Sequence, residues 1–137
     1  MPTNVPFGRF VGRAAADASD HARLVSLPTD IVLGISWAIK DQERDGIGSL
    51  AKTEYRANDT MDICDRTEGC DGIWVEAVDE TIAINDIPYV SLAAGQEGKV
   101  TKTTTGNISI AAMASFQSDL KTLTSGKKII LVSFNKV

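Results

Sequence analysis

The side chains that could do chemistry in this chain are few, and they do not form a catalytic pattern. His21 is the single histidine, and it lies in an N-terminal segment that we expect to be an extended arm. We expect such an arm to move, whereas a general base must be held beside the proton that it removes. Because nucleophilic catalysis needs a nucleophile, a base and an orienting group within reach of one another, we expect this protein to have no enzymatic activity.

Acidic residues gather in one stretch of the sequence, between residues 59 and 71. The stretch contains Asp59, Asp62, Asp65, Glu68 and Asp71. Two such carboxylates could serve a hydrolase, but a run of this kind is more often the solvated face and turns of a hairpin, and we favour that interpretation. The spacing lacks the central glycine and the ligand positions of a calcium-binding loop, so we expect no metal site here.

Cys64 and Cys70 are separated by five residues. Zinc sites usually show two close cysteine pairs or a histidine partner, and this spacing shows neither. A disulfide across the turn is an alternative, but a reducing cytoplasm disfavours it. We favour two reduced thiols that flank a hairpin turn, and the disulfide and the metal site stay open as alternatives.

Glycines and tryptophans offer no clear ligand site either. Gly46 and Gly48 lack the lysine of a P-loop and the third glycine of a dinucleotide-binding turn, so we expect no cofactor. We interpret Trp37 and Trp74 as core anchors or interface residues, with a sugar-stacking platform as the functional alternative.

The charge balance argues against nucleic acid as a partner. The chain of 137 residues has a net charge of −4, and its 14 basic residues are scattered, whereas phosphate binding draws on clustered ones. No apolar run reaches the ~18 residues of a membrane-spanning helix. Arg9 and Arg13 interrupt the apolar stretch that a secretory signal requires. We therefore expect the protein to act in the cytoplasm where it is made, or in something assembled there.

The hydrophobic pattern from Arg23 onward is typical of short β-strands. Apolar, β-branched runs alternate with turn residues roughly every 8–12 positions, and helical periodicity is weak. We therefore expect an all-β fold, a small barrel or sandwich of about eight short strands with at most one or two short helices. The expected elements are strands at 23–27 and 30–39 with a bulge at Gly34, a hairpin at 61–78, strands on both sides of 85–86, a polar strand at 97–105, an apolar strand at 106–116, a helical turn at 118–126 and a last strand at 127–137.

Residues 1–22 are expected to form an extended N-terminal arm, followed by a single β-rich domain over residues 23–137. Pro2 and Pro6 fix backbone angles and remove hydrogen-bond donors. The arm nevertheless carries the apolar side chains of Val5, Phe7, Phe10 and Val11. Either these side chains pack on the protein's own core, or the arm docks on another subunit, which is the interpretation that we favour.

Short motifs, mostly in the second half of the chain, resemble those of tailed-bacteriophage capsid cement, or head decoration, proteins. The matching pieces are "GIWVEA" (72–77), "INDIPYV" (84–90), "EGKVTKTTTGN" (97–107), "ISIAAMASF" (108–116) and "SGKKIILVSF" (125–134), and "IVLGISW" (31–37) resembles an earlier apolar strand of that family. The chain departs from the family pattern at Ile87, which stands between the aspartate and the proline of the second piece.

This resemblance implies a structural protein on the outer surface of an icosahedral phage head. It implies a homotrimer that bridges neighbouring major capsid proteins, is made in the host cytoplasm and is located on the virion capsid. The arm fits this role because apolar side chains and arginine are enriched in interface cores and hot spots. The residues expected to contact the capsid are Pro6, Phe7, Arg9, Phe10 and Arg13.

Other interpretations would leave different traces. A different β-barrel component of the same particle, from the tail or a spike, is the first alternative. A carbohydrate-binding module would expose a pair of tryptophans. A small hydrolase would need two carboxylates with separated pKa values in a pocket.

Overall fold

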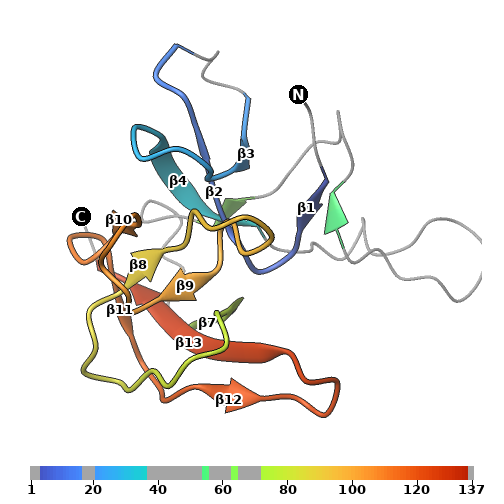
Figure 1. Ribbon diagram of the computed structural model, residues 1–137, viewed down its shortest axis with the longest axis vertical. Helices are drawn as coiled ribbons and strands as arrows, with labels where there is room; N and C mark the ends of the chain where they lie inside the picture. The colour runs from blue at the N-terminus through green and yellow to red at the C-terminus, as the bar shows by residue number, and fades with distance from the viewer. Residues whose placement is uncertain (1–3, 17–20, 37–53, 56–62, 65–71, 136–137) are drawn as a thin grey trace, which may run out of the picture.

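The computed structural model describes residues 4–16, 21–36, 54–55, 63–64 and 72–135 (Figure 1). Within these ranges the chain is all-β, with thirteen strands and no helix. The expected fold class is therefore confirmed. The strands are more numerous than expected because several of them are pairings of only two residues.

The described strands form four small sheets built from antiparallel pairs. The first contains β7 (Ile73–Glu76), β11 (Ala114–Phe116), β12 (Lys121–Thr122) and β13 (Lys128–Phe134). The second contains β2 (Phe10–Arg13), β3 (Arg23–Leu24), β4 (Ile31–Ser36) and β6 (Ile63–Cys64). The third contains β8 (Tyr89–Val90), β9 (Val100–Thr101) and β10 (Ile108–Ser109), and the fourth pairs β1 (Val5–Pro6) with β5 (Glu54–Tyr55).

Strand β13 organises the core because it has partners along both of its edges, with β7 on one side and β11 and β12 on the other (Figure 1). Ile130, Val132 and Phe134 alternate along it and are buried, as the period of two in a strand requires. The ring of Phe134 meets that of Phe10 from β2 edge-on, with the centroids 6.1 Å apart. One buried cluster joins these residues to Val90 of the third sheet.

Residues 5–13, expected within an extended arm, belong to the folded core instead. They contain β1 and β2, and β2 pairs with β3 and β4 across the predicted boundary at residue 23. Phe10 is 0% exposed, and Val11 is also buried. Burial of such a side chain stabilises the fold by roughly 1.5–3 kcal/mol, which explains why the segment folds inward. For the remainder of residues 1–22, the division into an arm and a domain stays a prediction.

The expected hairpin over residues 61–78 is wrong, because its two strands belong to different sheets. β6 pairs with β4, whereas β7 pairs with β13. The segment still has strand character, since Val75 in β7 and Ala77 just after it are buried while Trp74 is exposed. Local patterning identifies a strand here, but the partners of each strand lie elsewhere in the chain.

Cys64 is buried and disulfide-bonded, which corrects the favoured expectation of reduced thiols. The sequence contains one other cysteine, Cys70, which lies outside the described residues. Exchange with a reductant requires access to the sulfur. Burial of Cys64 therefore shields its own sulfur from attack by a reductant in the folded protein.

Two further segments differ from expectation. The stretch 106–116 is divided into β10 and β11 by a turn in which the N–H groups of Met113 and Ala114 both donate to the carbonyl of Ile110. Residues 118–126, expected as a helical turn, contain β12 and the turn into β13.

The last strand is confirmed as β13, and the register between β2 and β4 shifts beside Gly34, where the bulge is expected.

A charged turn connects β3 to β4. Asp30 is buried and accepts two hydrogen bonds from the guanidinium of Arg23, at 2.7 and 2.8 Å. It also accepts the N–H groups of Ser26 and Leu27, at 2.9 and 3.0 Å. The hydrogen bond from Arg23 is the main reason that the pKa of Asp30 falls to about 2, the backbone donors lower it further, and burial opposes the shift.

Acidification should weaken the fold through Asp30. Its folded pKa lies below the ordinary value of 3.8, so the carboxylate contributes stability that is present above about pH 4 and is lost as the pH falls toward about 2. The contribution at neutral pH is roughly 2 kcal/mol. Asp30→Asn should remove most of it and flatten the acid decline in the free energy of unfolding, measured with urea at each pH. An unchanged slope would contradict this role.

Gly98 allows the chain to pass close beneath the N-terminal segment. Its carbonyl accepts the N–H of Phe10 at 2.8 Å. Its φ is +81°, and an added Cβ would lie 2.6 Å from the carbonyl oxygen of Phe10. Gly95 has a similar φ of +80°, but an added Cβ there would meet nothing within 4 Å. Substitutions at these two glycines can therefore distinguish the cost of a positive φ from the cost of a steric clash.

Alanine should have unequal effects at these two glycines. Gly95→Ala should cost about 1 kcal/mol, because only the positive φ is strained. Gly98→Ala should cost about 3 kcal/mol, because the backbone at Phe10 must also move. Urea unfolding of the two variants measures the difference, and equal losses would mean that the N-terminal segment does not press on Gly98.

Candidate functional site

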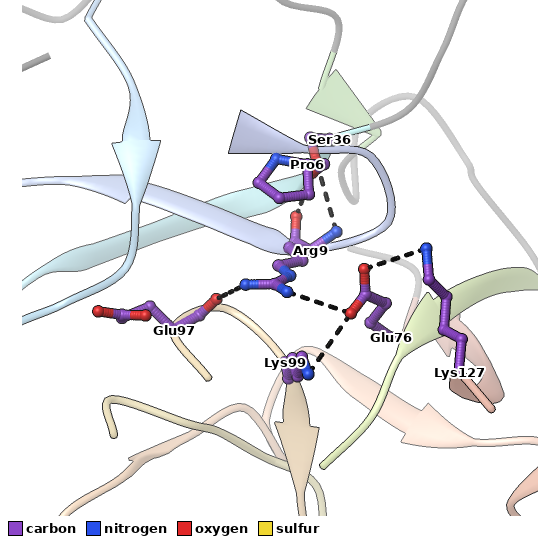
Figure 2. Close-up of polar contacts among 7 residues, drawn as sticks. All are labelled: Pro6, Arg9, Ser36, Glu76, Glu97, Lys99 and Lys127. Carbon is purple, nitrogen blue, oxygen red and sulfur yellow. Dashed lines mark hydrogen bonds and ion pairs between the residues drawn. The ribbon is translucent and has the colours of Figure 1, made fainter. Parts of the chain in front are cut away.

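One buried carboxylate gathers cations from separate parts of the chain (Figure 2). Arg9 Nη2 lies 3.2 Å and Lys99 Nζ 3.7 Å from Oε2 of Glu76. Lys127 Nζ lies 3.5 Å from Oε1. The side chain of Glu76 is only 9% exposed. We call these four residues the Glu76 cluster.

Four segments of the chain must meet to form the Glu76 cluster. Glu76 ends β7, Lys99 precedes β9 and Lys127 precedes β13. Arg9 lies in the turn between β1 and β2, which we call the N-terminal turn, and its Nη1 also donates to the carbonyl of Glu97 at 3.3 Å. A carboxylate that is removed from water needs cations or donors around it, because an unpaired buried charge is costly. Glu76 therefore favours the arrangement in which the N-terminal turn is docked.

Ser36, at the end of β4, holds the N-terminal turn from its other side (Figure 2). Its buried hydroxyl donates to the carbonyl of Pro6 at 2.8 Å. Its N–H donates to the carbonyl of Arg9 at 2.9 Å, and its carbonyl accepts the N–H of Gly8 at 2.7 Å. The carbonyl of Gly8 in turn accepts the N–H of Glu76 at 2.8 Å. The N-terminal turn is thus clamped between β4 and β7.

A surface groove of about 290 Å³ opens beside the Glu76 cluster, and we call it the Trp74 groove. Phe7, Trp74 and Ile129 contribute apolar lining, while Lys127 contributes a charge. Trp74 is 43% exposed, whereas the next residue, Val75, is buried, so β7 presents the indole outward and the valine to the core. Aromatic side chains are enriched in interaction surfaces.

The five predicted contact residues occupy different environments. Phe7 lines the Trp74 groove, Arg9 belongs to the Glu76 cluster, and Pro6 is bonded to Ser36 nearby. Arg13 is half-buried at the other end of β2. Phe10 is completely buried, so its side chain anchors the segment in the core and is not available at the surface. The structure therefore brings three of the predicted residues together and separates two.

Sequence reasoning misses Glu76, Lys99 and Ser36. A readable signal exists for Glu76, because a charged residue between apolar ones in the strand "IWVEA" needs a partner if that face is buried. The signal does not identify the partner, since Arg9 lies 67 positions away in the sequence. Ser36 carries no comparable signal, because its role depends on a backbone turn from another part of the chain.

The Glu76 cluster holds charges together and offers no evident reaction centre. Among the described residues, no group of three or more His, Cys, Asp or Glu could hold a metal ion. His21 is exposed and does not line the Trp74 groove. In the same part of the chain, no helix has the length and apolar character needed to cross a membrane. The predictions for Trp37, Gly46, Gly48, Asp59, Asp62, Asp65, Glu68 and Asp71 concern residues outside the described ranges.

Removing the anion of the Glu76 cluster should destabilise the protein more than removing its most exposed cation. Glu76→Gln leaves Arg9 and Lys99 close together without a counter-charge, and should cost about 3 kcal/mol. Lys127→Gln is the matched control, because that side chain is 52% exposed, and it should cost less than about 1 kcal/mol. Urea unfolding compares the two. A Glu76→Gln protein as stable as the control would show that the carboxylate is not needed to hold these segments.

Comparison with known proteins places this arrangement in a family. A family model described as "Structural cement protein (E217 gp24/Pam3 gp6)" matches residues 2–135. No curated protein and no solved structure gives a significant match. The match includes the N-terminal turn, β7 and β13, and therefore both the Glu76 cluster and the Trp74 groove. It also confirms the resemblance carried by the short motifs: the chain belongs to the phage structural cement protein family.

Proposed function

We propose that this cement protein binds the outer surface of an assembled phage head and stabilises it by bridging neighbouring major capsid proteins. The observation that carries the proposal is the family match over residues 2–135. The net charge of −4 supports a protein partner over the nucleic acid inside the head. The role is mechanical, because stabilisation comes from adhesion between shell subunits.

The physical basis of this stabilisation is mass action. A protein that binds the assembled shell, and not its free subunits, shifts the equilibrium toward the assembled state. We propose that the chain acts as a homotrimer, made in the host cytoplasm and then located on the virion surface. Three linked contacts of modest strength would hold such a trimer on the shell by avidity.

The surface proposed to meet the capsid lies around the N-terminal turn. Pro6, Phe7 and Arg9 come together there, and the deeply buried Phe10 fixes the backbone that carries them. Arg13, at the other end of β2, would extend the contact along the same strand. A contact surface held by a buried anchor loses little conformational freedom on binding, which favours affinity.

Binding to empty heads that lack this protein tests the proposal. The purified chain should sediment with assembled heads, leave free major capsid protein unbound, and raise the temperature at which the heads disassemble. Equilibrium sedimentation of the free chain should give the mass of three copies. Failure to bind heads would refute the cement role for this chain. A monomer or dimer that still binds would refute the trimer alone.

A further inference from the structure

The Trp74 groove combines an apolar lining with a cluster of cations at its side. Phe7, Ile73 and Ile129 line it together with the half-exposed indole of Trp74. The Glu76 cluster beside it holds three cationic side chains around a single carboxylate. The Glu76 cluster therefore carries a net charge of +2, although the chain as a whole is acidic.

Lys127 is the cation best placed to bind something else. Its side chain is 52% exposed and it lines the groove, whereas those of Arg9 and Lys99 are 14% and 18% exposed. A lysine ammonium has three donors, and the Nζ of Lys127 lies 3.5 Å from one oxygen of Glu76. It can therefore keep this ion pair and still bind a second carboxylate that enters from the groove.

The backbone of β7 also offers an edge at Trp74. Among the described strands, β7 pairs with β13 alone. Glu76 turns its N–H away from β13, toward Gly8, and residues two apart in a strand direct their backbone groups to the same side. Leu131, opposite Trp74 on β13, uses its N–H and carbonyl with Ser118 and Gln117 on its far side. The N–H and carbonyl of Trp74 therefore point away from β13, toward the edge on which the N-terminal turn docks at Glu76, and they have no hydrogen-bond partner among the described residues.

We propose that the Trp74 groove receives an extended segment of a major capsid protein, which places an apolar side chain between Phe7 and Trp74 and a carboxylate beside Lys127. The inference rests on the proposed function and names the part of the surface and the chemistry of the partner segment. The apolar side chain matches the lining, and the carboxylate matches the excess cation. A segment in extended conformation can also bond to the free backbone groups of Trp74, as in strand addition at a sheet edge.

Two variants test the two halves of this contact in the head-binding assay. Trp74→Ala removes the apolar anchor and should weaken binding to empty heads by about thirtyfold, the loss typical of an aromatic hot spot. Lys127→Gln removes the cation and should weaken binding about fivefold at low salt. It should also reduce the salt dependence of binding, because one screened ion pair is gone.

Two control variants change comparable exposed side chains outside the groove, one apolar and one cationic. Ile87→Ala truncates an apolar side chain that is 55% exposed, and Lys102→Gln removes an exposed cation. Neither residue lines the groove, so both variants should bind heads as the parent protein does. The midpoints of urea unfolding confirm that each variant is folded before its binding is compared.

A carbodiimide cross-link identifies the partner of Lys127, because this reagent joins an amine to a carboxylate in direct contact. On heads, Lys127 should be linked to an aspartate or glutamate of the major capsid protein; in the free chain, its internal link to Glu76 is expected. A link to a second copy of this chain would overturn the inference in favour of a self-contact. If the parent protein binds heads and both groove variants bind equally well, the groove is not the contact and the cement role stands. If the parent protein does not bind, both proposals fail.

Discussion

The docking of the N-terminal turn on β7 is the interaction on which the rest of the structure depends. Phe10 closes the core against Phe134, and Arg9 supplies the closest cation to the buried Glu76. Without the turn, the carboxylate would remain in a poorly hydrated site with less compensation, and the faces of β4 and β7 would lose the chain that lies between them. Hydrophobic burial and charge pairing therefore support the same arrangement.

This arrangement suits a protein whose work is adhesion. Trp74 lies on β7 next to Val75, which is in the core. Phe7 lies in the N-terminal turn, which is hydrogen-bonded to both β4 and β7. Side chains held in this way keep their positions without a partner. Binding of a partner to them would therefore cost less ordering entropy than binding to an extended arm. The same bonding holds Phe7 and Arg9, two of the residues proposed to contact the capsid, in a segment that the sequence alone places outside the domain.

The sequence predicts the fold class because strand periodicity and turn residues are local signals. It predicts β13 and β4 well, since both are long apolar runs with β-branched residues. It does not predict that β6 and β7 separate into different sheets, because pairing depends on segments far along the chain. It also places Phe10 on the surface, because an apolar residue in a proline-containing segment looks the same whether its partner is another molecule or Phe134.

The packing of β2 against β13, which lie far apart in the sequence, has a consequence for synthesis. A ribosome makes residues 5–13 well before β13, so Phe10 lacks the ring of Phe134 until that later strand emerges. Contacts this distant in sequence form slowly and leave apolar surface uncovered in the meantime. A chain that stops before β13 would keep that surface exposed to chaperones and proteases.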